Sequence, residues 1–301
     1  MKKHISNQFS GRSTAADFSV RSREYTMKNK INYSIQSQIT NPGKYRRCFD
    51  NLPSNISELC QIVQGVMLHI HWADRYGIAV TKERQHEEGL RKVNRQLALI
   101  TERTSSTFSL PRSQRIFGTC RDFSTMLCSI LRHQNIPSRP RCGFATYFGP
   151  KKCDHWVCEY WDPILNKWRL VDAQLDDLQI KNLGVDFDTT DIPKGKFLVA
   201  GEAWQQCQNG ADSNDFGIMN WFGLWFVKGN LIRDLLSLSK LELLPWDTNE
   251  AIGPYKNQKI KLEEYSLLDI ASQITIEGDY LKVKDFLKKN KELCMCTEWT
   301  P

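Results

Sequence analysis

Hydrophobic residues recur at helical spacing in three stretches of the N-terminal half of the chain. The first follows Asn55, a residue suited to cap a helix N-terminus, with Glu58 three positions later. Its apolar face is formed by Leu59, Ile62, Val63, Val66, Met67 and Ile70. The second stretch spans about 83–103, and the third runs from Cys120 to about His133. His69, His71 and Trp72 lie at the end of this helix, and the two histidines are expected to be structural or exposed and not ligands.

The pattern changes from helical spacing to alternation after Pro137, and alternation predicts strands. The predicted strands are 139–148, 155–162 and 167–173, with 197–201 and 222–228 as further candidates. Helical spacing returns at 234–244, 263–274 and 280–293. Helices followed by an antiparallel sheet and then by more helices predict an α+β fold.

Charge is distributed unevenly along a chain of globular composition. Of the 301 residues, 41% are hydrophobic and 25% are charged. Residues 1–47 hold ten Lys or Arg against two acidic residues, a local excess of eight that accounts for the net charge of +7. Without interleaved aromatic residues or a binding motif, this pattern favours a solvated terminus over nucleic-acid contact. We therefore expect a disordered basic arm over 1–24 and a single domain over 25–301.

Targeting signals and cysteine usage point to a cytoplasmic protein. The N-terminus lacks the apolar region of a secretory signal, and no apolar run approaches the roughly 18 to 20 residues of a membrane span. In this setting the ten cysteines are expected to be reduced thiols, and no membrane contact is expected. No oligomeric state follows from the sequence.

The residue types of a cysteine-nucleophile site occur in order along the predicted core. Cys120 begins the third helix, His155 begins a strand, and Asp172 ends the next strand. Thr119 and Asp122 resemble a capping box, which places Cys120 in the first helical turn. There the helix dipole stabilises a thiolate and is expected to lower the pKa of the thiol.

Strand register brings the histidine and the carboxylate together. If Asp162 faces Lys167 in a hairpin, Asp172 lies opposite Val157 and diagonal to His155. A turn two residues shorter would put Asp172 directly opposite His155. Either register leaves the carboxylate roughly 5 to 8 Å from the histidine Cβ, close enough to orient the imidazole.

Two structural interpretations compete with catalysis. Cys120 could be a small buried core residue, as we expect for Cys128. A zinc site could be assembled from Cys142, Cys153, His155 and Cys158. On one strand, however, positions 153 and 155 point to one face and 158 to the other, so we expect no metal and no cofactor.

Residues 114–178 resemble the transglutaminase-like superfamily. The motif is a helix-borne Cys, a His beginning a strand in Asp-His-Trp-Val-Cys-Glu-Tyr, and an Asp ending the next strand in Trp-Arg-Leu-Val-Asp-Ala-Gln-Leu-Asp. More diffusely, residues 25–300 resemble bacterial transglutaminase-domain proteins. The resemblance implies a papain-like core over about 84–178, covered by an extension over about 179–301. It also implies that Cys120 is the nucleophile, His155 the base and later the acid, and Asp172 the orienting carboxylate.

The expected chemistry is acyl transfer from an amide or peptide bond, through a thioester, in a protein or peptide substrate. Gln114 lies six residues before Cys120, the spacing of an oxyanion-hole glutamine in papain-like proteases, with plain surface exposure as the alternative. Arg121 stands where animal transglutaminases carry a Trp, which favours hydrolysis over amine transfer. A catalytically silent module that binds a protein or peptide is the alternative from another class.

Overall fold

The computed structural model describes residues 27–104, 108–248, 251–253 and 259–294. The predicted basic arm, residues 1–24, lies outside them. The longer helices are α2 (Ile56–Val66), α3 (Val93–Arg103), α4 (Cys120–His133), α5 (Asp177–Leu183), α6 (Ala200–Gln208), α7 (Leu224–Leu238), α8 (Glu264–Glu277) and α9 (Tyr280–Lys289). The strands are β1 (Met67–His69), β2 (Ile116–Gly118), β3 (Ser138–Ala145), β4 (Lys152–Asp162), β5 (Lys167–Val171), β6 (Phe197–Val199), β7 (Phe216–Ile218) and β8 (Trp221–Phe222).

The central sheet has six strands and is mostly antiparallel. Its order is β6-β3-β4-β7-β8, and β5 pairs with β4. Only the β4–β7 pair of this sheet is parallel. A separate parallel pair, β1 and β2, leads into helix α4.

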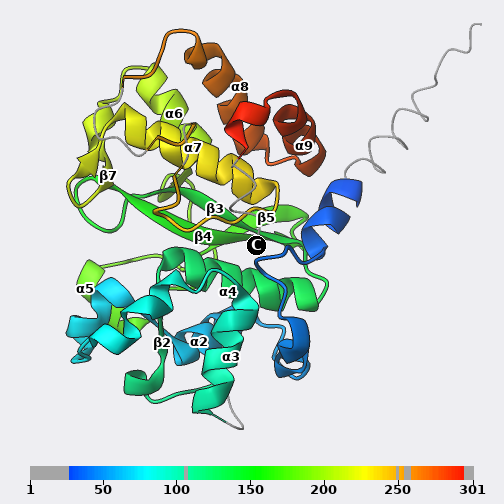
Figure 1. Cartoon of the computed structure of the whole chain (residues 1–301), viewed down its shortest axis with the longest axis vertical. Helices are drawn as coiled ribbons and strands as arrows, with labels where there is room; N and C mark the ends of the chain where they lie inside the picture. The colour runs from blue at the N-terminus through cyan, green and yellow to red at the C-terminus, as the bar shows by residue number, and fades with distance from the viewer. Residues whose placement is uncertain (1–26, 105–107, 249–250, 254–258, 295–301) are drawn as a thin grey trace, which may run out of the picture.

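Two helical layers enclose the sheet, which gives the predicted α+β architecture with the Cys120 helix packed on the strands. Figure 1 shows α6, α7, α8 and α9 on one side and α2, α3 and α4 on the other. Each layer has its own hydrophobic core against the sheet, one built around α7 and the other around α4. In the described part of the chain, no helix combines the length and apolar character needed to cross a bilayer.

Helix α4 forms where the sequence predicts it, and α2 begins at the predicted cap. The predicted extension of the first helix to Met67 and Ile70 is wrong, because α2 ends at Val66 and Met67–His69 pair with β2 as strand β1. The Asn55 side chain accepts the backbone N–H of Glu58 at 3.2 Å, as a helix N-cap should. Helix α4 spans the predicted residues and is buried along almost its whole length. Cys128 is buried in the core as expected, and its sulfur lies 3.1 Å from that of Cys158 on β4.

The predicted single helix over 83–103 is wrong, because the structure divides it. Residues Lys82–Gly89 form a 3-10 segment, and α3 begins only at Val93. The reason is a buried carboxylate: Glu87 accepts the backbone N–H of Phe117 at 2.8 Å and pairs with flanking arginines. This contact ties the segment to β2 and interrupts the helical register.

The predicted strand at 222–228 is also wrong. The described structure continues as a strand only to Phe222, and α7 then runs from Leu224 to Leu238. Because α7 contacts β3 as well as α6, α8 and α9, its residues from Val227 onward are buried on every side. A helix buried all round lacks the amphipathic pattern that identifies helices in a sequence.

A layer of buried charge joins α7 to the sheet. Arg141 on β3 contacts the carboxylate of Asp234 on α7 at 2.8 Å and that of Glu159 on β4 at 2.7 Å. Arg139 also contacts Glu159, at 2.6 Å. These charge-assisted bonds fix α7 over the strands that carry the candidate site.

Candidate active site

Cys120 is the first residue of α4, at the point where strand β2 turns into the helix. The Asp122 carboxylate accepts the backbone N–H of Thr119 at 2.8 Å and its hydroxyl at 3.0 Å. Gln96 and Arg121 donate to the other oxygen of Asp122 at 2.9 Å. The predicted pairing of Thr119 with Asp122 is confirmed, and it holds Cys120 in the first turn.

His155 and Asp172 are brought together by the predicted hairpin. Asp162 pairs with Lys167 in the β4–β5 ladder, which confirms the first of the two predicted registers. His155 Nε2 lies 2.7 Å from Asp172 Oδ2, and both side chains are buried. Since Nε2 contacts the carboxylate, Nδ1 is the ring nitrogen left to exchange a proton with another group.

Asp172 is itself fixed by two further donors. The hydroxyl of Tyr147 donates to Oδ2 at 2.8 Å, and the backbone N–H of Gln174 donates to Oδ1 at 3.0 Å. Three donors therefore converge on one carboxylate, which orients it toward His155. Sequence reasoning missed Tyr147, because a Tyr in a predicted strand carries no signal of such a contact.

Cys120 meets the same strand that carries His155. The backbone N–H of Trp156, the next residue on β4, lies near enough to the Cys120 sulfur to act on the pKa of the thiol. Cys120, Trp156 and Cys142 pack together as one small buried cluster. The N-terminus of α4 thus contacts β4 at the position of the histidine.

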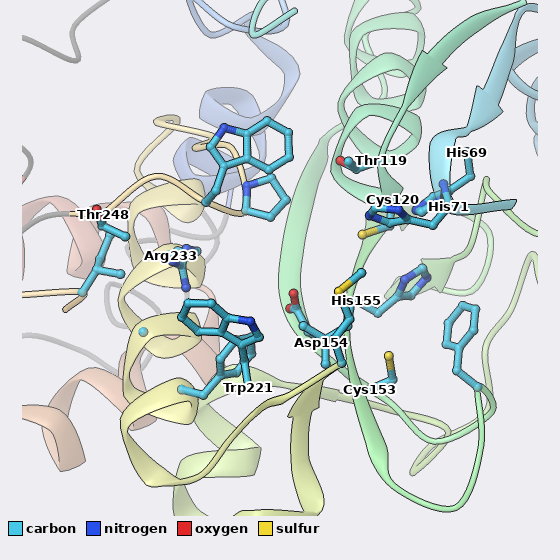
Figure 2. A pocket seen from close by; sticks show the side chains of 18 of the residues that line it. His69, His71, Thr119, Cys120, Cys153, Asp154, His155, Trp221, Arg233 and Thr248 are labelled. Atoms are coloured by element: carbon cyan, nitrogen blue, oxygen red, sulfur yellow. Dashed lines mark hydrogen bonds between the residues drawn. The ribbon is translucent and has the colours of Figure 1, made fainter. Parts of the chain in front are cut away.

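These groups open onto a cavity of about 640 Å³. Thr119, Cys120, Asp154 and His155 lie on one side of it. Figure 2 shows Trp221, Arg233 and Thr248 on the opposite side. The cavity therefore separates the candidate nucleophile from a wall built by the C-terminal part of the chain.

The expected fall in the pKa of the Cys120 thiol is wrong. Burial raises this pKa well above its usual value, and the charge of Asp154 adds to the effect. The Trp156 N–H opposes the rise but does not overcome it. The reason is that the helix start is desolvated and faces carboxylates, whereas the prediction considered the helix dipole alone.

Two histidines that follow α2 also line the cavity, and of these His71 is exposed, as expected from the sequence. His69 and His71 approach Cys120 because β1 pairs with β2 in parallel, placing His69 beside Gly118. His69 is buried, and its Nδ1 accepts the backbone N–H of His71 at 3.3 Å. Burial lowers the pKa of His69 to about 3, with contributions from His71 and His155, so its ring is neutral.

Gln114 does not join this site. It is exposed in a short 3-10 turn, and its backbone carbonyl accepts a bond from Arg103 at 3.0 Å. The chain between Gln114 and Cys120 is extended as β2, which carries the glutamine away from the sulfur. The structure therefore corrects the oxyanion-hole assignment in favour of surface exposure.

The zinc alternative receives no support from the side-chain arrangement. Cys158 contacts Cys128 in the core, whereas His155 contacts Asp172. Across the residues that the structure describes, no group of three or more His, Cys, Asp or Glu side chains is arranged to hold a metal ion.

Comparisons with known proteins give a family match over the part of the chain that carries these residues. Residues 81–173 match the family model of the transglutaminase-like superfamily, a span that contains Cys120, His155 and Asp172. A candidate cysteine protease from Cytophaga hutchinsonii is a similar solved structure, with 18% sequence identity and a TM-score of 0.30. The match covers 48% of this chain and 42% of that one. No curated protein matches the chain.

Proposed function

From the match of residues 81–173 to the transglutaminase-like superfamily we infer that this chain is a cysteine-based enzyme. We propose that it cleaves amide or peptide bonds through a thioester on Cys120. One observation carries the proposal. His155 lines the same cavity as Cys120 and contacts Asp172 behind it at 2.7 Å. This arrangement supplies a nucleophile, a base and a group that orients the base.

The first half of the reaction follows from the state of each group. The Cys120 thiol is neutral at rest, so its proton moves to Nδ1 of His155 as the sulfur attacks the substrate carbonyl carbon. The carbonyl oxygen then carries the negative charge of the tetrahedral intermediate. His155 returns the proton to the leaving nitrogen, the C–N bond breaks, and the amine or ammonia departs. Asp172 stabilises the imidazolium that exists between these two transfers.

The second half releases the acyl group. Water loses a proton to His155 and attacks the thioester carbonyl, the C–S bond breaks, and the proton returns to the sulfur. The products are a carboxylic acid and free Cys120. An amine could replace water in the same step, as it does in animal transglutaminases. Where those enzymes carry a Trp, however, this chain has Arg121, which has a structural role and donates to Asp122 and to the Glu242 carbonyl. We therefore propose hydrolysis as the main outcome.

The negative charge on the carbonyl oxygen requires hydrogen-bond donors, and the exposed Gln114 is not among the residues that line the cavity. The backbone N–H of Cys120 is suitable, since first-turn N–H groups have no acceptor within their helix. His69 is a second donor. Its Nδ1 accepts a bond from His71, so its neutral ring carries the proton on Nε2.

The His69→Ala variant tests this role. Acylation by p-nitrophenyl acetate passes through an oxyanion, whereas alkylation by iodoacetamide does not. We expect the variant to lose roughly 10²–10³ in acylation rate at Cys120 while keeping its alkylation rate. Equal losses in both rates would indicate a structural role for His69 instead.

A brief, sub-stoichiometric iodoacetamide treatment tests the proposed function. Peptide mapping should find alkylation concentrated at Cys120, which is only 9% exposed, and much less at the exposed Cys294. The His155→Ala variant should lose the selectivity. Labelling that follows exposure and is unaffected by His155→Ala would instead support a catalytically silent protein- or peptide-binding module.

The same protein can be used to distinguish hydrolysis from amine transfer. After acetylation of Cys120 by p-nitrophenyl acetate, thioester decay is followed by intact mass with and without methylamine. Decay to acetate in both conditions supports hydrolysis. Conversion mainly to N-methylacetamide would support a transferase.

A further inference from the structure

Arg233, on helix α7, is a buried cation that lines the cavity opposite His155 (Figure 2). Its exposed fraction is 7%. The other buried lysines and arginines that the structure describes each have a carboxylate oxygen within 4.0 Å. They are Arg121, Arg132, Arg139, Arg141 and Lys228. In the described part of the chain, Arg233 has no such partner.

The contacts of Arg233 are all with neutral acceptors. Its Nη1 donates to the Asn230 side-chain oxygen at 3.2 Å, and its Nη2 donates to the backbone carbonyl of Asp247 at 3.1 Å. Its Nε has no acceptor among the described residues. A buried cation without a contacting anion is costly, and an anionic ligand group would complete it.

Two carboxylates lie near Arg233 without contacting it: Asp247 is paired with Arg91, and Asp154 is held away. Asp154 accepts a bond from the Asn230 amide at 2.7 Å, so Asn230 stands between the acid and the guanidinium. Asp154 precedes His155 and adds negative charge beside Cys120. An anionic group is therefore repelled at the Cys120 end of the cavity and attracted at the Arg233 end.

Aromatic side chains line the same cavity as this cation. Trp221 and Trp246 line the cavity while remaining 45% and 48% exposed. Trp225 also lines it, and its ring centroid lies 5.8 Å from that of Trp221. Exposed tryptophans gathered at a cavity are typical of ligand-binding surfaces. All three lie outside the span that matches the family model.

We propose that Arg233 and this aromatic wall bind a carboxylate group of the substrate, with an apolar group stacked on the tryptophans. The inference rests on the proposed function, since it assumes that the reacting carbonyl is placed at Cys120. The substrate class is then an acidic amide or peptide. Its carboxylate is either a C-terminal group or an acidic side chain.

Thiol reagents that differ only in charge test this subsite on the full-length protein. N-iodoacetyl-phenylalanine carries a carboxylate, and N-iodoacetyl-phenylalaninamide is its neutral counterpart. The carboxylate reagent should alkylate Cys120 about tenfold faster than the amide, as expected for one charge-assisted contact. The exposed Cys294 is the internal reference and should show no such preference. Iodoacetate, whose carboxylate would lie next to Asp154, should be slower than iodoacetamide.

Variants assign the preference to one residue. Arg233→Gln should abolish it, so that both reagents react at the same rate within that variant, whereas Arg233→Lys should retain part of it. The matched control is Arg75→Gln, which removes an exposed arginine beside Trp72 at the cavity and should keep the preference. N-iodoacetyl-glutamic acid α-amide tests whether the bound carboxylate belongs to an acidic side chain or to a C-terminus, because its only carboxylate is on the side chain.

The outcomes are separable. An equal rate for both reagents at Cys120 of the unmodified protein overturns the inference without any variant, so a folding defect in Arg233→Gln cannot hide the result. A preference that persists in a folded Arg233→Gln protein overturns it as well. Failure of the neutral reagent to label Cys120 selectively overturns the proposed function itself.

Discussion

Replacing Asp172 with Asn changes one atom in the hydrogen-bond arrangement that positions His155. Asp172 accepts bonds from three donors: the Nε2–H of His155, the hydroxyl of Tyr147 and the backbone N–H of Gln174. Asparagine has a single acceptor oxygen. The Tyr147 hydroxyl can turn and accept a bond, but the Gln174 N–H can only donate.

The substituted amide is therefore expected to place its oxygen toward Gln174 and its NH₂ toward His155. His155 Nε2 must then accept, which moves the ring proton to Nδ1 and blocks transfer of the Cys120 proton. If the amide turns so that His155 keeps its productive tautomer, the side-chain NH₂ points at the backbone N–H of Gln174. Two donors then face each other, which costs about 1–3 kcal/mol. Loss of the negative charge beside the imidazolium adds to this, so we expect acylation of Cys120 to slow by roughly 10²–10⁴.

The assay is the rate of Cys120 acylation by p-nitrophenyl acetate, with thermal unfolding measured in parallel. Tyr147→Phe is the matched control, because it removes one donor to Asp172 and leaves the tautomer intact. We expect it to slow acylation by less than about tenfold. A folded Asp172→Asn protein within about threefold of the unmodified rate would refute the tautomer argument.

Three further predictions concern charge. Asp154→Asn removes a negative charge that raises the pKa of the Cys120 thiol, so the pH at which Cys120 alkylation reaches half its maximal rate should fall. An unchanged midpoint would contradict an effect of the Asp154 charge. Arg141→Met leaves the buried Asp234 carboxylate without its cation and Glu159 with Arg139 alone. It should lower the free energy of unfolding in urea by about 3–5 kcal/mol, against less than about 1 kcal/mol if the pairs are dispensable. Arg139 and Arg141 lower the pKa of Glu159 to about 2 despite its burial, so the unmodified protein should be more stable than Glu159→Gln by an amount that is complete above about pH 4.5 and shrinks as the pH falls toward about 2. A stability difference that does not depend on pH would be inconsistent with an ionised Glu159.

Local patterns were enough to predict the elements that carry the candidate triad. The cap at Asn55, helix α4 and the β4–β5 register depend on residues close in sequence, and all are confirmed. Alternation and turn position alone place Asp172 within reach of His155. The family resemblance of the core is confirmed as well by the match over 81–173.

Errors occurred where distant contacts control the outcome. Glu87 divides a predicted helix by binding a strand, and burial on all sides hides the start of α7 from any periodic pattern. Gln114 has a suitable spacing from Cys120, yet the extended strand between them separates the two. Sequence spacing does not specify distance where the conformation of the intervening segment is not predicted.

The sequence by itself determined the residue types of the site and the local elements that present Cys120, His155 and Asp172, because helix caps and strand registers are short-range. Tertiary packing decided the rest. It brought His69 beside the nucleophile, desolvated the thiol and placed Arg233 across the cavity. Proton affinity and ligand charge depend on which side chains surround a group in space, and those neighbours come from segments far apart along the chain.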